Sequence, residues 1–132
     1  MKEQNTKHTT YKLGYHLVWC PQYRKPVLTG GIAADAEAEL RRLAQSNGWT
    51  IHTLVVQPDH VHLFLSAPPA VAPSLIANTL KGASARTLFK QHPELKQELW
   101  GGHLWSRSFY VGSVGDVSED GVRRYLEAQR HE

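Results

Sequence analysis

The chain has 132 residues, 41% of them hydrophobic and 20% charged, which suits a single folded domain over residues 1–132 and argues against disorder. It is mildly basic, with a pI of about 9.1, and its only cysteine, Cys20, excludes a disulfide framework and a cysteine-based metal site. No stretch approaches the ~20 apolar residues of a membrane span, and the first residues lack the apolar run of a signal peptide. We therefore expect a cytoplasmic protein with no membrane association.

The first half of the chain predicts a strand, a helix and two further strands. Residues Tyr11–Cys20 are rich in aromatic and β-branched side chains, as is typical of a strand. Apolar residues recur at helical spacing from about Ile32 to Ser46, and Asn47-Gly48 is a helix stop signal. The strands Trp49–Gln57 and Val61–Ala67 follow, and the short break between them predicts a hairpin.

The second half predicts a helix, a strand and a last helix. A helix is expected from about Ser74 to Lys90, followed by a short helical turn within QHPELKQELW and a strand near Ser108–Val114. Ser118 is a suitable N-cap for a final helix over about 118–130, because acidic residues fill its first turn, where the helix dipole favours them.

This order of elements is β-α-β-β-α-β-α. It predicts an α+β chain with the split βαβ, ferredoxin-like (RRM-like) fold. We expect an antiparallel sheet with helices on one face and an extra C-terminal helix. We expect that last helix to be free to reach outward, because no strand is predicted after it.

The charged residues are unevenly distributed. Between Glu39 and Glu94 the only acid is Asp59, although this span holds five basic residues. Such segregation is compatible with a basic face that binds a polyanion. The signal is weak by itself, because many basic proteins bind no nucleic acid.

The segment PDHVHLFL places two histidines inside a strand that is otherwise apolar. Side chains alternate across a strand, so His60 and His62 share one face while Val61 and Leu63 point to the other. Two imidazoles on one face can bind one divalent cation, although at least one more ligand must come from elsewhere. The alternative is that both histidines cap the sheet and form local hydrogen bonds. Asp59 either orients an imidazole or is a turn residue.

The last helix carries a second pair of candidate residues. Tyr125 and Gln129 lie at positions i and i+4 and therefore share one helical face. A glutamine amide oxygen is a suitable ligand for Mg²⁺ or Mn²⁺, and a tyrosine beside a metal can attack a phosphodiester. The alternative is that Tyr125 belongs to an apolar helical stripe with Val122 and Leu126.

Together these segments resemble one known family. PDHVHLFL is similar to the histidine–hydrophobe–histidine (HUH) motif of single-tyrosine transposases of small insertion sequences, and YLEAQ resembles their nucleophile helix. YHLVWCPQYRKPVL, LKGASAR and LWGGHLWSRSFYVGSVG resemble, in the right order, the family's first strand and basic turn, second helix and fourth-strand region. The resemblance runs from about Tyr11 to Gln129, nearly the whole chain, so residues 1–132 would form a single HUH transposase domain.

The resemblance implies a mechanism and a substrate. It implies that His60, His62 and Gln129 hold Mg²⁺ or Mn²⁺ while Tyr125 cuts DNA and forms a 5′-phosphotyrosine. The substrate would be single-stranded DNA with hairpins near the ends of a mobile element. A homodimer would supply one tyrosine for each end, with Tyr125 acting either in cis or in trans.

Six basic residues are candidates for contacts with DNA phosphates, although each is equally compatible with an ordinary solvated surface. They are Arg24, Lys25, Lys81, Arg86, Arg123 and Arg124.

Three other functions are compatible with parts of the sequence. A histidine-triad nucleotide hydrolase would explain HVHLFL, but Phe64 stands where its third histidine belongs and YLEAQ has no role. A non-catalytic module for single-stranded nucleic acid would have the same fold. A domesticated relative that cuts repeated palindromes would share the same site residues.

Overall fold

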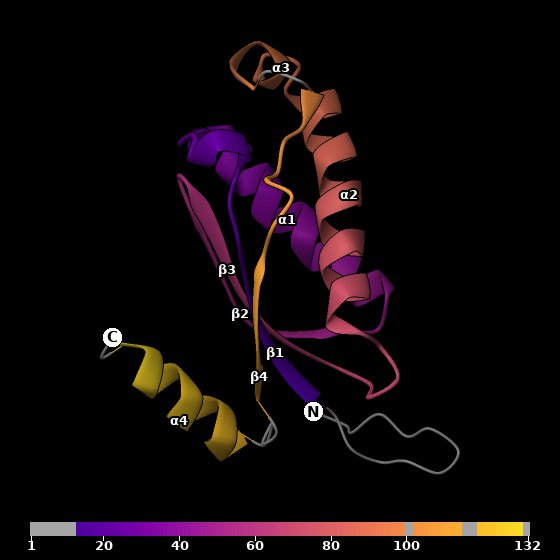
Figure 1. The fold of residues 1–132 in the computed structure, drawn as a ribbon, viewed down its shortest axis with the longest axis vertical. Helices are drawn as coiled ribbons and strands as arrows, with labels where there is room; N and C mark the ends of the chain where they lie inside the picture. The colour runs from indigo at the N-terminus through magenta and orange to yellow at the C-terminus, as the bar shows by residue number, and fades with distance from the viewer. Residues whose placement is uncertain (1–12, 100–101, 115–118, 131–132) are drawn as a thin grey trace.

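A computed structural model describes residues 13–99, 102–114 and 119–130 (Figure 1). The strands are β1 (Leu13–Trp19), β2 (Thr50–Gln57), β3 (His60–Ala67) and β4 (Tyr110–Val114). The helices are η1 (Gln22–Arg24), α1 (Gly30–Ser46), α2 (Pro73–Gln91), α3 (Leu95–Glu98) and α4 (Glu119–Arg130). This order confirms the predicted succession of elements. Across the described segments, no helix is both long and apolar enough to cross a membrane.

The four strands form one antiparallel sheet in the order β2-β3-β1-β4. β2 and β3 pair as the predicted hairpin, with Gln57 opposite His60 and Pro58-Asp59 at the turn. β1 lies in the centre of the sheet between β3 and β4. Strands that are consecutive in sequence are thus separated by helices or paired as one hairpin, which is the split βαβ arrangement and confirms the predicted fold class.

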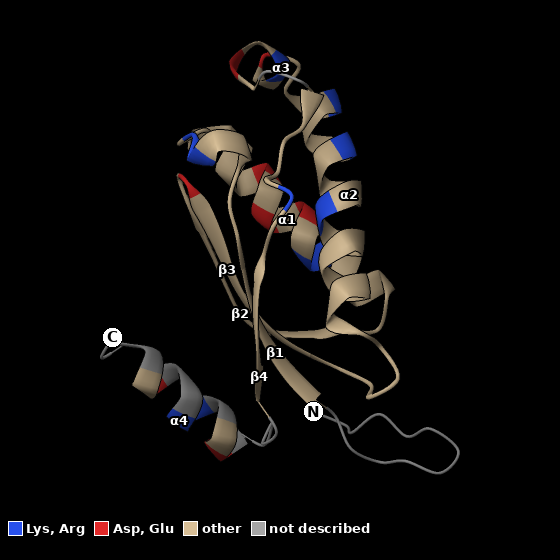
Figure 2. Cartoon of the chain, viewed as in Figure 1, with Lys and Arg blue, Asp and Glu red and all other residues tan. Residues whose placement is uncertain are grey.

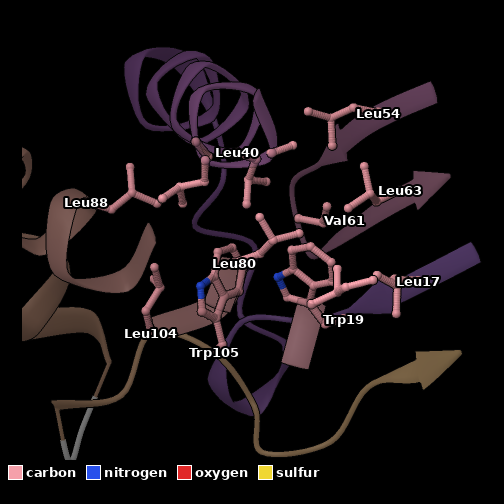
Figure 3. Close-up of a cluster of buried hydrophobic side chains, with 14 of the residues drawn as sticks. Leu17, Trp19, Leu40, Leu54, Val61, Leu63, Leu80, Leu88, Leu104 and Trp105 are labelled. Atoms are coloured by element: carbon pink, nitrogen blue, oxygen red, sulfur yellow. The ribbon is translucent and has the colours of Figure 1, made fainter. Parts of the chain in front are cut away.

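Helices α1 and α2 cover one face of the sheet, and α4 lies across the sheet from them (Figure 1). The core between α1, α2 and the sheet is apolar (Figure 3). Trp19 on β1 meets Trp105 edge-on, with ring centroids 5.9 Å apart, and the Trp105 indole N–H donates to Ser84 Oγ at 3.0 Å. Each fully buried leucine or valine in such a core contributes about 1.5–3 kcal/mol.

Strand β3 separates an apolar face from a polar one. Val61, Leu63 and Leu65 are fully buried against the helices, whereas His60 and His62 point to the opposite face and remain partly accessible. This is the alternation expected from the sequence. The strand therefore contributes to the core and to a site at the same time.

The strands contain no charged side chains, and the charge lies on helices and loops (Figure 2). α2 carries three basic residues and no acid, whereas α1 carries both signs. Three of the five basic residues between Glu39 and Glu94 therefore lie on α2.

One polar cluster joins α1 to α2 within this apolar layer. Glu39 on α1 is only 7% exposed and accepts hydrogen bonds from Arg42 Nε at 2.7 Å and Nη2 at 2.9 Å, and from Thr87 Oγ1 on α2 at 2.7 Å. The hydrogen bond from Arg42 is the largest cause that lowers the pKa of Glu39, and it outweighs the opposing effect of burial. The carboxylate is therefore charged and fully bonded at neutral pH.

We expect Glu39→Gln to lower the free energy of unfolding by about 1–2 kcal/mol at pH 7, because charge-assisted hydrogen bonds become neutral ones. Because the folded pKa of Glu39 is depressed, its stabilisation is complete above the ordinary value of 4.5 and is lost as the pH falls through the folded value. The variant does not titrate there, so its deficit should shrink in acid. Urea unfolding from neutral pH to below 4.5 measures this. Glu37→Gln, whose partner Arg41 is 3.8 Å away on the surface, is the control.

Candidate metal centre and DNA-cleaving site

The two histidines of the H-x-H motif lie at the start of β3, on the face of the sheet away from α1 and α2. Their ring centroids are 4.7 Å apart and the rings are nearly perpendicular, at 81°. The next position on this face is Phe64, which is 2% exposed and packs edge-on against the His52 ring. A third catalytic histidine is therefore replaced by a packing residue, which argues against the histidine-triad alternative.

The Nδ1 atom of His60 is engaged by a carboxylate. It lies 2.7 Å from Asp59 Oδ1, and Asp59 Oδ2 lies 3.2 Å from Arg24 Nε. The hydrogen bond with His60 is the largest cause that lowers the pKa of Asp59, and the charge of Arg24 acts in the same direction. The carboxylate is thus an acceptor that holds a proton on His60 Nδ1 and leaves Nε2 for other partners.

The Nδ1 atom of His62 also faces another side chain, which the sequence did not single out. His16 on β1 places its Nε2 3.3 Å from His62 Nδ1, and the two rings stack with centroids 5.5 Å apart. Burial lowers the pKa of His62, and the neighbouring His60 and His16 add to the effect. His62 is therefore neutral at physiological pH, which is the form that binds metal ions. A histidine within an otherwise apolar strand was the signal available for His16.

The imidazoles of His60 and His62 fit half of a site for a divalent cation. Neither Nε2 atom has a hydrogen-bond partner among the described residues, and imidazole suits many divalent transition metals. The described segments contain no cluster of three or more His, Cys, Asp or Glu side chains arranged to hold a metal. Any further protein ligand must therefore be of another type or come from elsewhere.

The loop before α1 reaches this half-site through Arg24. Tyr23 and Arg24 both have left-handed backbones, with φ of 59° and 57°, and both side chains are exposed. Such a conformation costs roughly 1–2 kcal/mol per residue for side chains other than glycine. The loop is fixed by the hydrogen bond from Gln22 N to Leu104 O at 2.8 Å. The loop therefore keeps a defined shape beside Asp59 in spite of its unfavourable backbone conformation.

The predicted phosphate contacts are placed in different surroundings. Arg86 is exposed on α2, and Arg123 and Arg124 are exposed on α4, where Arg123 contacts Asp120 at 3.1 Å. Lys25 Nζ donates to Glu98 O at 2.8 Å. These side chains lie on separate elements of the surface.

Lys81 is buried instead, and its ammonium group is used within the protein. Its Nζ lies 2.6, 3.3 and 3.4 Å from the carbonyl oxygens of Ser106, Arg107 and Ser108, and 5.7 Å from the centre of the Phe109 ring. Burial lowers the pKa of Lys81, while the three carbonyls favour its charged form. Lys81 therefore anchors the segment that leads into β4, and this placement offers no free charge to a phosphate.

Tyr125 and Gln129 fall within α4, and their side chains lie outside the described part of the structure. The same is true of Ser118, the predicted N-cap. The helix itself is present as predicted, across the sheet from α1 and α2 (Figure 1).

Comparison with known proteins assigns this arrangement to a family. The family model for IS200-like transposases matches residues 9–129. The chain belongs to the IS200-like transposase family. It is 44% identical over 119 residues to the ISDra2 transposase TnpA of Deinococcus radiodurans, covering 90% of this chain and 85% of the relative. It is 29% identical over 131 residues to the IS200 transposase of Salmonella typhimurium, covering 97% and 86%.

Solved structures give the same picture of the transposase fold. A crystal structure of a Deinococcus radiodurans R1 protein assigned as a transposase matches with a TM-score of 0.78 and 40% identity, over 96% of this chain and 97% of that one. A REP-associated tyrosine transposase bound to a REP hairpin matches in fold, with a TM-score of 0.56, 16% identity and coverage of 99% and 74%. The family resemblance inferred from the sequence is thus confirmed, and membership supports a role in DNA transposition.

We expect Lys81→Met to lower the free energy of unfolding by about 1–3 kcal/mol, because the carbonyl groups of residues 106–108 lose the buried ammonium group that donates to them. The exposed Lys90 on the same helix is the matched control, and Lys90→Met should change stability by less than about 0.5 kcal/mol. Urea unfolding monitored by tryptophan fluorescence measures both variants. Equal, small effects would contradict the anchoring role of Lys81.

Proposed function

We propose that this transposase cleaves and rejoins single-stranded DNA at insertion-sequence ends through a 5′-phosphotyrosine intermediate on Tyr125, assisted by a divalent metal. The observation that carries the proposal is the paired imidazoles of His60 and His62. Each has its Nδ1 atom beside another side chain and its Nε2 atom unpartnered among the described residues. Side chains that only capped the sheet would not need this shared orientation.

His60, His62 and Gln129 are the residues that would hold Mg²⁺ or Mn²⁺. Two imidazoles and an amide oxygen form a compatible set, in which Gln129 would supply the oxygen ligand. When bound, the ion would supply positive charge to the scissile phosphate. Asp59 and His16 would hold the Nδ1 sides of His60 and His62, which leaves the Nε2 atoms of both rings for the ion.

Tyr125 would attack the phosphorus of the scissile phosphodiester. A bond forms between Tyr125 Oη and phosphorus, the bond from phosphorus to the 3′ oxygen breaks, and that oxygen leaves as a 3′-hydroxyl after taking up a proton. Tyr125 loses its own proton in the attack, since free tyrosine has a pKa of about 10. The phosphotyrosine conserves the energy of the cut bond, so a second 3′-hydroxyl can reverse the reaction and join strands without a nucleotide cofactor.

The proposed substrate is single-stranded DNA that carries a hairpin near the element end. The relative in fold that is bound to a REP hairpin supports a hairpin as the recognised shape, and the insertion-sequence relatives support a mobile element as its source. Arg86, Arg123 and Arg124 are exposed and would contact phosphates. Because an element has two ends and each chain offers one nucleophile, the working unit would be a homodimer.

We expect Tyr125→Phe to abolish a covalent protein–DNA adduct that the wild type forms with a labelled single-stranded hairpin oligonucleotide and Mg²⁺, because phenylalanine has no nucleophilic oxygen. Denaturing gel electrophoresis detects the adduct. Tyr110→Phe is the matched control, because Tyr110 is 61% exposed on β4 and also loses one hydroxyl. An adduct that persists in Tyr125→Phe would show that another residue is the nucleophile.

We expect His60→Ala to reduce adduct formation by at least about 10²-fold while hairpin binding in EDTA is unchanged, since a metal ligand is removed without altering phosphate contacts. Titration with Mn²⁺, followed by electron paramagnetic resonance, should show weaker binding in this variant. The exposed His103 provides the control His103→Ala. Loss of folding in His60→Ala would instead favour a structural role for the histidine.

A further inference from the structure

Arg24, Asp59 and His60 form a continuous chain of contacts at the edge of the half-site. Arg24 Nε lies 3.2 Å from Asp59 Oδ2, and Asp59 Oδ1 lies 2.7 Å from His60 Nδ1. The two carboxylate oxygens thus have separate partners. A carboxylate held at one oxygen by a guanidinium has a fixed direction for the other oxygen.

We propose that Arg24 is a positioning residue of the metal centre, which acts through Asp59 to hold His60 in one orientation and one tautomer. The proposal rests on the proposed metal role of His60. Asp59 accepts a hydrogen bond from the Nδ1–H of His60, so the ring's free lone pair is on Nε2, the atom that would face the cation. Arg24 keeps Asp59 from turning away into solvent.

The backbone of the loop supports this role. Tyr23 and Arg24 both adopt left-handed conformations that residues other than glycine rarely adopt, and such strain gathers at functional sites. The hydrogen bond from Leu28 N to Pro58 O, 3.0 Å long, ties the chain after Arg24 to the β2–β3 turn that carries Asp59. A backbone hydrogen bond therefore joins the loop to the turn in addition to the ion pair.

Loss of the contact between Arg24 and Asp59 should have only a local effect. The side chains of Arg24 and Asp59 are 68% and 35% exposed, and exposed ion pairs add little to global stability. A surface pair of this kind needs no strained backbone to exist, as Arg41 and Glu37 on α1 demonstrate. We therefore expect the consequence of the Arg24 contact to appear at His60 and not in the unfolding midpoint.

The test compares Arg24→Ala with Arg41→Ala, which removes an exposed, ion-paired arginine far along the chain. The ¹⁵N shifts of the histidine side chains are measured on the full chain without metal or DNA. Wild type and Arg41→Ala should show His60 with its proton on Nδ1, whereas Arg24→Ala should show a mixture of tautomers. Mn²⁺ affinity should fall about three- to tenfold in Arg24→Ala and about 10- to 100-fold in Asp59→Ala.

A double variant tests whether Arg24 acts only through Asp59. If it does, Arg24→Ala adds no further loss of Mn²⁺ affinity in the Asp59→Ala background. Additive losses would overturn the proposal. Arg24→Gln repeats the comparison with an uncharged polar side chain longer than alanine, and retention of the wild-type amide spectrum excludes misfolding.

Arg24 was also a candidate phosphate contact, and the two roles give opposite results. A phosphate contact predicts weaker oligonucleotide binding by Arg24→Ala in EDTA, with the His60 nitrogen shifts unchanged, and that result would overturn the proposal. If the wild type binds no Mn²⁺, the metal function of the half-site is wrong. In that case, the ¹⁵N shifts of His60 in Arg24→Ala still show whether Arg24 orients the ring.

Discussion

The alternation of side chains along β3 is the constraint on which the site depends. Val61, Leu63 and Leu65 are buried beneath α1 and α2, and their burial fixes the register of the strand within the sheet. A slip of one residue would expose all three and bury the imidazoles, at a cost of several kcal/mol. The direction of His60 and His62 is thus set by the apolar residues beside them. Packing of the apolar core thus orients the two imidazoles without requiring polar contacts.

Much of the fold could be predicted because its signals are local. Periodicity and turn residues gave the order of elements, and Asn47-Gly48 ends α1 as expected, with Gly48 at a φ of 77°. One boundary that differed is the start of β4, predicted near Ser108 and observed at Tyr110. The reason is Lys81, whose ammonium group binds the carbonyls of residues 106–108 and draws them toward α2. Lys81 and Ser106 are 25 residues apart in the sequence, so their contact produces no periodic pattern from which it could be predicted.

The same distinction separates the predictable part of the site from the rest. His60 and His62 are two residues apart, so strand geometry alone places them together. The contact between His16 and His62 depends on the pairing of β1 with β3, in which His16 lies opposite Phe64 and diagonally from His62. The contact of Arg24 with Asp59 depends on a loop whose left-handed residues are not glycine, asparagine or aspartate. Sequence patterns therefore indicated His60 and His62 as candidate ligands and Asp59 as a candidate to orient one of them, but they gave no sign of the contacts made by His16 and Arg24.

In the proposed reaction, the two imidazoles lie on a rigid sheet, whereas the nucleophile and the third ligand lie on a separate helix. The imidazoles lie on a sheet whose strands are paired along their length and whose far face is packed, so their separation is fixed by the backbone. Tyr125 and Gln129 belong to α4, which lies outside the layer formed by the sheet with α1 and α2 (Figure 1). A half-site of two ligands binds a cation more weakly than a complete one, so metal affinity and delivery of α4 would be coupled. Because Gln129 and Tyr125 share one helical face, a single docking event would add the last ligand and the nucleophile together. Cleavage would then be confined to the assembly in which α4, from the same chain or its partner, is in place.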